Sequence, residues 1–444
     1  MSIPLAQLYH HLDNINNEMY SDCILIYHFY PHGSKNIENL IPLSDTDLDY
    51  FDKIRYANMI MHDQEPLQYD YYYGGDIVNY NCNRSILNGV VRPFNWPITD
   101  KTTQQELAII EVYKNLNLRF LTGNAFSVYD LTLLTHSEKN SPELKKYEDN
   151  GFLGVYWWCH AVIAQDWFRY FQYVTQKKKV KKTFLIYNRA WSGTREYRLK
   201  FAEWVVRLGL EDQCKTNINP IEPEDGMHYK THQFSNPTWR PGIELENYFT
   251  PTDAASWSSA VINLNDYEST DIEVVLETLF DDPRQQLTEK ALRPIACAQP
   301  FILASTVGSL EYLRSYGFKT FQDVWDEEYD LIVDPKERLI RITELMRQIA
   351  NWDPKTRFNK LRQAQDIADY NKKLFFSESW QNRIIDEYKN NLSSAMKIMK
   401  NNITAINTRK IQQLKPDSVL SPNQKETRKK IFETVDKVKA KFNQ

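Results

Sequence analysis

The sequence lacks any apolar run close to the roughly 18 residues that a membrane-spanning helix needs. Its first residues, MSIPLAQLYHHLDN, lack the basic region and apolar core of a secretory signal. Cysteine is scarce, with five scattered residues in 444 and no CxxC pair, which suits a reducing compartment. These absences predict a cytoplasmic protein with no transmembrane segment.

Excess positive charge is also absent, because the formal net charge is −4. This argues against a generally basic nucleic-acid coat protein, although it leaves room for a local basic surface. The tail from 401 to 444 is such a region, with ten Lys or Arg and four Asp or Glu. A basic amphipathic tail binds DNA or an acidic membrane surface. A solvated pair of terminal helices is the alternative.

The chain is organised around a strand–helix–strand pattern in its second half. An apolar run at 274–276 ends in Glu277, and a second run, 300–304, follows about 25 residues later, a spacing typical of a βαβ unit. Between them, apolar residues recur on one side of a helix that begins near Thr288. Arg293 falls on the other side, together with Glu289 and Lys290. The length of 444 residues suggests two or three domains of this α/β kind.

The start of this helix is the candidate ligand site. Thr288 is predicted to be the N-cap, which places Glu289 and Lys290 in the first turn, where free backbone N–H groups attract anions. The carboxyl end of a parallel sheet is where α/β folds bind nucleotides. A carboxylate from Glu289 or Glu277 can accept ribose hydroxyls, and the Lys290 ammonium can face phosphate. A capped amphipathic helix with a solvated charged face is the alternative.

A second set of candidate residues opens the same domain. The lysine run 177–182 is interpreted as a solvated linker, and 183–187 as the first strand. Arg189 and Arg195 follow that strand, and arginine binds a diphosphate in a bidentate way that lysine cannot. A surface arginine cluster is the alternative. After Ala304, Gly308 and Ser309 form another strand-to-helix turn where a diphosphate or sugar can approach.

Three carboxylates before the lysine run are candidates for a catalytic base, because transfer to a hydroxyl requires a proton acceptor. Asp63 and Glu65 lie in a predicted loop at a strand end, and Glu138 follows the apolar run 133–135. A salt bridge that orders the loop is the alternative for the first two. His160 lies among aromatic residues, which favours a core histidine over a catalytic group.

Metal ligation is not predicted. Asp45-Thr46-Asp47 matches a metal-binding DxD pattern but is better interpreted as helix capping. His228 and His232 are four residues apart without further ligands at metal spacing, so they do not indicate a zinc site. They lie in the polar stretch 212–256, whose length indicates a functional or mobile loop.

The block LTEKALRPIACAQPFIL, with VVLETLF before it and GSLEYLRSYGFKTFQDVWDEEYD after it, resembles the donor-binding segment of glycosyltransferases found in tailed-phage genomes. Its Thr-Glu-Lys core is similar to the nucleotide-binding motif of the α-1,3-fucosyltransferases, which have the GT-B fold. In those enzymes the Glu holds the ribose and the Lys holds the diphosphate. The matching positions are Glu289 and Lys290, and the match extends over roughly 183–330.

The resemblance implies two Rossmann-like α/β domains facing a cleft, with a helical C-terminal extension. The expected boundaries are 1–178 for the acceptor-side domain, 179–377 for the donor domain and 378–444 for the final helices, the first of which crosses back to the first domain. The implied reaction moves a sugar from a nucleoside diphosphate sugar, a UDP-sugar being the first expectation. No cofactor is expected beyond this co-substrate.

The acceptor is a second expectation. Phage enzymes of this kind decorate hydroxylated or hydroxymethylated cytosines, and the cationic tail is compatible with double-stranded DNA as partner. A surface glycan, a lipid-linked sugar or a protein is the alternative acceptor. A non-catalytic scaffold that binds nucleotide without transferring sugar is a further alternative.

Overall fold

The computed structural model divides the chain into two compact units. Unit 1 comprises Met1–Ser137, Pro142–Cys159 and Ile385–Gln444, and unit 2 comprises Glu138–Ser141 and His160–Ile384. The structure describes residues 12, 15–16, 18–19, 23–30, 55–62, 66–67, 84–87, 90–93, 132–149, 152–188, 190–223, 226–249 and 262–413. For residues 23–30, 55–61, 84–87, 90–93 and 399–413 it describes the backbone alone. Both units contain a sheet with parallel strands, so the predicted α/β class is confirmed.

Unit 1 contains a six-stranded sheet in the order β4-β3-β1-β2-β5-β6. Four strands are parallel neighbours in chain order: β1 (Cys23–Tyr30), β2 (Arg55–His62), β5 (Thr132–His136) and β6 (Phe152–Tyr156). β3 (Arg84–Leu87) and β4 (Val90–Pro93) are antiparallel to each other, and β3 is antiparallel to β1. The sequence predicts strands at 22–30 and around 133–135, and β1 and β5 confirm them. It also offers a strand candidate near 118–122, which lies outside the described residues.

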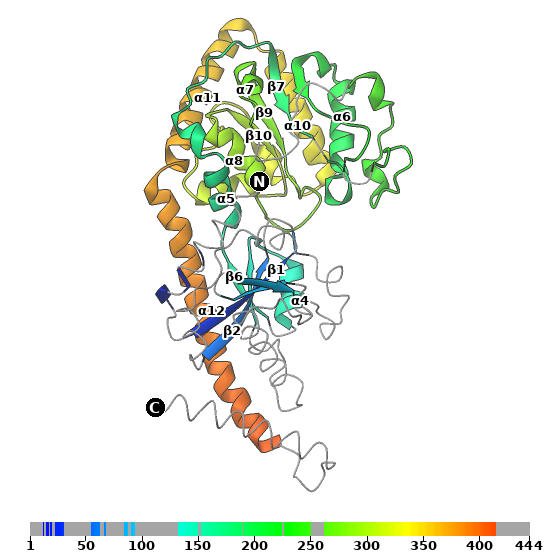
Figure 1. Cartoon of the computed structure of the whole chain (residues 1–444). Coiled ribbons are helices and arrows are strands. Elements are labelled where there is room, and N and C mark those ends of the chain that lie inside the picture. The colour runs from blue at the N-terminus through cyan, green and yellow to red at the C-terminus, as the bar shows by residue number, and fades with distance from the viewer. Residues whose placement is uncertain are drawn as a thin grey trace, which may run out of the picture. The chain divides into compact units, whose positions relative to one another are not determined.

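Unit 2 contains a four-stranded parallel sheet in the order β10-β9-β7-β8 (Figure 1). Its strands are β7 (Lys182–Ile186), β8 (Cys214–Thr216), β9 (Thr270–Leu276) and β10 (Phe301–Ala304). In β7, Phe184 to Ile186 are fully buried, as expected for a parallel strand covered on both faces. The chain runs from β7 to β8 on one side and then to β9 on the other. The strand order therefore reverses between β7 and β9.

The helices that the sequence predicts around this sheet are present. α8 (Glu289–Ala296) joins β9 to β10, which confirms the βαβ unit, and α6 (Tyr197–Arg207) follows β7. The other helices and 3-10 turns of unit 2 are α5 (Cys159–Trp167), η6 (Arg169–Tyr173), η7 (Gly193–Arg195), η8 (Glu211–Gln213), η9 (Pro237–Trp239), η10 (Leu245–Asn247), α7 (Leu264–Glu268), α9 (Ser309–Ser315), η11 (Glu328–Leu331), α10 (Pro335–Ala350) and α11 (Pro354–Phe375). α4 (Pro142–Asp149) belongs to unit 1, and α12 (Glu378–Gln413) contributes residues to both units. None of the described helices is long and apolar enough to cross a membrane.

Two expectations between β7 and β9 are corrected. β8, a three-residue strand paired in parallel with β7, lies within the stretch 212–256 that was expected to be a loop. The apolar pattern of residues 260–264 predicts a strand, but Leu264 opens helix α7, and the strand begins only at Thr270. Asn263 caps α7 through its side chain, which accepts from the N–H of Asn265, so a local hydrogen bond overrides the apolar pattern.

The lysine run 177–182 is not a solvated linker. The N–H groups of Lys179 and Lys181 donate to main-chain oxygens of Glu268 and Ser269. The ammonium of Lys178 donates to the main-chain oxygens of Tyr267 and Thr270, each at 2.9 Å. Although Lys178 as a residue is exposed, its ammonium is enclosed, and burial lowers the pKa of Lys178 to about 8. The run is therefore an integral part of unit 2, whose boundary lies near His160 rather than at the expected residue 178.

Arg293, on the charged side of α8, is buried. Arg293 is 4% exposed and donates at 2.6 Å to Glu273, a fully buried residue in β9. Tyr267 donates to the other oxygen of Glu273 at 2.7 Å, and the Arg293 guanidinium lies 4.3 Å from the ring centre of Tyr187. Arg293 therefore fixes the helix to the sheet, and the alternative of a solvated charged face does not hold for this residue.

Candidate functional site

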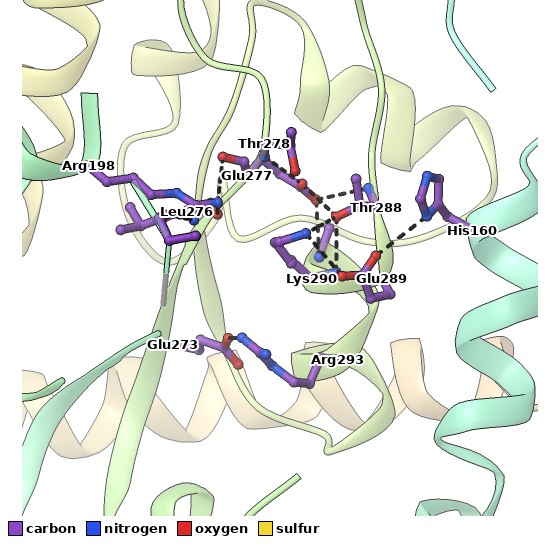
Figure 2. A network of polar contacts seen from close by, with 12 residues as sticks. His160, Arg198, Glu273, Leu276, Glu277, Thr278, Thr288, Glu289, Lys290 and Arg293 are labelled. Atoms are coloured by element: carbon purple, nitrogen blue, oxygen red, sulfur yellow. Dashed lines mark hydrogen bonds and ion pairs between the residues drawn. The ribbon is translucent and has the colours of Figure 1, made fainter. Parts of the chain in front are cut away.

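The candidate site lies where the strand order of unit 2 reverses, at the carboxyl ends of β7 and β9. Ligands of open α/β sheets bind at such a switch point. Arg198, at 3% exposure, holds the two strand ends together, because its guanidinium donates to the main-chain oxygens of Ala190, Leu276 and Glu277 at 2.6, 2.7 and 3.0 Å. Burial lowers the pKa of Arg198 from its usual value. Figure 2 shows this guanidinium beside the end of β9.

The N-terminus of α8 is occupied by a carboxylate of the protein itself. Glu277, fully buried, accepts from the N–H groups of Thr278, Thr288 and Ala291 at 3.1, 3.0 and 3.3 Å. The Thr288 hydroxyl donates to the same carboxylate at 2.8 Å (Figure 2). Glu277 was expected to face a ligand, but its buried position and these partners make it a positioning residue. Several of the backbone N–H groups expected to attract an anion, those of Thr288, Lys290 and Ala291, thus already have acceptors within the protein.

The side chains of Glu289 and Lys290 are the candidate ligand contacts of α8. Thr288 is the N-cap and accepts from the N–H of Lys290, as predicted. The Lys290 ammonium contacts Glu289 at 3.0 Å and the Thr288 hydroxyl at 3.2 Å, and its side chain is 21% exposed. Lys290 is thus neither buried in apolar packing nor fully solvated.

His160 completes the group around Glu289. Its Nδ1 lies 3.5 Å from a Glu289 oxygen, and its Nε2 has no hydrogen-bond partner within the described parts of the chain (Figure 2). Burial alone raises the pKa of Glu289, but Lys290 and His160 outweigh it and hold this pKa well below its usual range. The carboxylate is therefore ionised at neutral pH. The sequence favoured a satisfied core histidine at 160, whereas neither ring nitrogen of the buried His160 has a hydrogen-bond partner in the described part of the chain.

A carboxylate, that of Asp330, also accepts a hydrogen bond at the start of α9, after the turn that follows β10. Gly308 has a φ of 76° and caps α9, and a Cβ there would lie 2.7 Å from the side-chain nitrogen of Gln285. Ser309 is fully buried, and its hydroxyl contacts Ser305 and the oxygen of Thr306 at 2.9 and 2.6 Å. Asp330 accepts from the N–H of Leu310 at 3.0 Å. The expected approach of a diphosphate to Gly308 and Ser309 is thus not open at this helix end.

Asp330 makes stability depend on pH. Burial raises the pKa of Asp330 from 3.8 to about 6, so the folded state favours the protonated form. The contribution of protonated Asp330 to the free energy of unfolding is complete below pH 4. It is lost as the pH rises through 6, where the carboxyl group ionises. Asp330→Asn keeps an oxygen for the Leu310 N–H and cannot ionise. Two pKa units correspond to about 3 kcal/mol, so the variant should gain up to that much over the wild type between pH 4 and 7. Urea unfolding at several pH values tests this, and parallel stabilities would contradict it.

Glu138 belongs to unit 2 and lies in the segment next to the start of α8. Lys139 and Gln285 form a two-way backbone bridge with hydrogen bonds of 2.9 and 3.0 Å. Glu138 is 2% exposed and pairs with Arg284 at 3.3 Å. Arg284 also binds Asp282 through two hydrogen bonds. The role that the structure shows for Glu138 is therefore an ion pair with Arg284.

Hydrogen bonds connect the loop between β8 and α7 to the segment after β7. The carboxylate of Glu222, fully buried, accepts from the N–H groups of Trp191 and Ser192 at 2.8 Å each. Glu196 accepts from the N–H of Ser235 and contacts His232, both at 2.8 Å. His228 contacts Glu246 at 3.0 Å. Both histidines therefore have carboxylate partners, in the stretch 212–256 that the sequence predicts to be a functional or mobile loop.

Of the remaining candidate site residues, the structure describes Arg195 and does not describe the others. Asp63, Glu65, Arg189 and the Asp45–Asp47 pattern lie outside the described residues, as do the side chains of the tail from 401. Arg195 is half-buried at the end of η7 and close enough to Arg198 to lower its pKa electrostatically. The structure thus brings Arg195, Glu277, Glu289 and Lys290 to one end of one sheet.

Asn188 is a site residue that the sequence did not single out. It follows β7, is fully buried, and neither atom of its side-chain amide has a hydrogen-bond partner in the described part of the chain. Its main-chain N–H donates to Asn217 at 2.5 Å. An unsatisfied buried amide costs free energy. An amide residue directly after a fully buried strand is the signal that marks it in the sequence.

A comparison of the chain with protein-family models found no match, and a comparison with curated proteins found none either.

Proposed function

We propose that unit 2 binds a nucleoside diphosphate sugar and that the protein is a glycosyltransferase. The observation that carries the proposal is the ionised Glu289 beside the Lys290 ammonium, in the first turn of the helix that joins β9 to β10. The ammonium is a counter-charge for a departing diphosphate, and the carboxylate accepts from ribose hydroxyls. Rossmann-like binding at the switch point, with unit 1 as the acceptor side of a GT-B enzyme, is the finer arrangement that we propose.

Side chains rather than backbone groups supply the positive charge. Glu277 accepts from the N–H groups of Thr288 and Ala291 at the start of α8, and Asp330 accepts from that of Leu310 at the start of α9, so an anionic ligand has less to gain from these helix ends. Lys290 and Arg195 remain as cations near the switch point, with Arg189 as a further candidate outside the described residues. Binding that depends on such charges weakens as salt rises.

The preferred acceptor is a hydroxylated or hydroxymethylated cytosine in double-stranded DNA, with a UDP-sugar as donor. Asp63 and Glu65 are the candidate bases, because Glu138 is held by Arg284. A surface glycan, a lipid-linked sugar or a protein is the alternative acceptor, and the donor site is the same in each case. A non-catalytic scaffold would bind the nucleotide and neither transfer nor hydrolyse the sugar.

Sugar transfer should not require a divalent cation, because Lys290 and Arg195 supply the charge that a metal supplies in other transferases. Turnover in a chelator such as EDTA should match turnover in added Mg²⁺ or Mn²⁺, measured as release of nucleoside diphosphate. Complete loss of activity in the chelator, restored by a metal, would contradict this expectation.

A panel of nucleoside diphosphate sugars tests the proposal through thermal unfolding of the full chain. A donor present at 100 times its dissociation constant stabilises the folded protein by about 2.7 kcal/mol, which is a clear shift of the midpoint. We expect one nucleotide to shift it with several sugars and the matching sugar to shift it most. If no nucleotide or nucleotide sugar changes the midpoint, the proposed donor site is wrong.

A further inference from the structure

An extended segment before β7 carries three exposed lysines at alternate positions. The main-chain N–H groups of Lys177, Lys179 and Lys181 donate to Glu268 Oε1, Glu268 O and Ser269 O at 2.9, 2.8 and 2.8 Å. Because alternate N–H groups bind the same neighbouring segment, the backbone is extended and the three side chains share one face. At about 3.3 Å per residue, successive lysines on that face are roughly 6.6 Å apart.

The lysines at the intervening and following positions, Lys178 and Lys182, do not share this face. Lys178 directs its ammonium inward to Tyr267 and Thr270, and Lys182 donates to the main-chain oxygen of Asp212. Lys177, Lys179 and Lys181 are exposed, and no acidic side chain in the described parts of the chain forms an ion pair with their ammonium groups. Unpaired cations at a regular spacing form a ready site for a polyanion.

Two exposed aromatic side chains precede these lysines. Tyr170 and Tyr173 in η6 are 69% and 82% exposed, although large aromatic residues are usually well buried. The guanidinium of Arg169 lies 4.6 Å from the ring centre of Tyr170, which leaves the ring and a cation together at the surface. Tyr173 lies four residues before Lys177. Exposed rings and a row of cations are the two components of a surface for unpaired nucleic-acid strands, and here they follow one another closely along the chain.

We propose that Tyr170, Tyr173, Lys177, Lys179 and Lys181, called the lysine–tyrosine strip, bind single-stranded nucleic acid. The regular lysine spacing suits a stretched sugar–phosphate backbone, with one phosphate for each ammonium group. The tyrosine rings stack on unpaired bases, which a duplex keeps inside its own stack. This proposal does not rest on the transferase chemistry, because none of the five residues belongs to the donor site.

Binding of a fluorescently labelled oligothymidylate to the full chain, followed by anisotropy over a series of salt concentrations, tests the strip. Each phosphate contact on a single strand contributes about 0.7 to the slope of log K against log salt. The triple variant Lys177→Gln, Lys179→Gln, Lys181→Gln should therefore lower the slope by about 2. The double variant Tyr170→Ala, Tyr173→Ala should weaken binding at every salt concentration by fivefold or more with an unchanged slope, since stacking of a base contributes about 1–3 kcal/mol.

A matched control removes the same charge elsewhere in unit 2. Lys336, Arg341 and Arg347 are exposed on α10, which packs against α6. Changing all three to Gln should leave both slope and affinity as in the wild type. The basic tail is the same in all variants, so any contribution that it makes to binding is the same in each. A lysine variant with the slope of the wild type, or tyrosine variants with unchanged affinity, would overturn the proposal. Equal binding of the same sequence as a duplex would do so as well.

Discussion

Glu277→Ala should destabilise unit 2 by about 3 kcal/mol or more, because it leaves several buried donors without partners at about 1–3 kcal/mol each. Those donors are the Thr288 N–H and hydroxyl and the N–H of Ala291. Without the carboxylate, the first turn of α8 also loses its attachment to the end of β9. Equilibrium unfolding in urea, monitored by circular dichroism, measures the loss.

Glu311→Ala is the matched control for Glu277→Ala. Its side chain is 72% exposed and pairs with Arg314 on the surface of α9, and exposed pairs contribute about 0–1 kcal/mol. Glu277→Gln should fall between the two, since the amide retains one acceptor oxygen and loses the charge. If Glu277→Ala unfolds at the same urea concentration as Glu311→Ala, the carboxylate does not organise the helix.

Lys290→Ala should lower sugar-transfer turnover by about one to two orders of magnitude, the equivalent of losing a charge-assisted contact of about 1.5–3 kcal/mol. The lost contact is the one between the ammonium and the diphosphate whose charge grows as the sugar leaves. Steady-state release of nucleoside diphosphate separates the effect on kcat from that on KM. An effect realised in the transition state lowers kcat.

The Lys290 variant also affects Glu289, because its ammonium is one of the groups that lower the pKa of that buried carboxylate. Thermal unfolding should therefore be measured beside activity, so that a loss of stability is not mistaken for a loss of catalysis. Lys290→Arg keeps the charge and should retain more activity than Lys290→Ala. Lys336→Ala, on the exposed surface of α10, should have no effect. Unchanged turnover in Lys290→Ala would remove this residue from the mechanism.

The sequence predicted correctly those features that depend on hydrogen bonds and burial within a short stretch of chain. Thr288 caps α8 through a bond to a residue two positions away, and buried strands such as 184–186 are visible as apolar runs. The hairpin of β3 and β4 was not predicted, although the dipeptide Asn88-Gly89 between the two strands is a strong hairpin signal.

Contacts between distant residues could not be predicted from the same patterns. Glu277 reaches donors 11 and 14 residues further along the chain, and nothing in the strand pattern separates this role from a ligand-facing one. Arg293 looked like part of a polar helix face, but its partner Glu273 is 20 residues away in β9. The lysines at 177–182 formed an ordinary charge run, and only their hydrogen bonds to 267–270 show that alternate members point in opposite directions.

The central claim is that the first turn of α8 binds a nucleoside diphosphate through Lys290. Calorimetric titration of the full chain with UDP and other nucleoside diphosphates, at low and high salt, tests it most directly. The account predicts that one of them binds, that binding weakens as salt rises, and that Lys290→Ala weakens it at least about tenfold. Absence of binding by every nucleoside diphosphate, or equal affinity of the wild type and the variant, would contradict it.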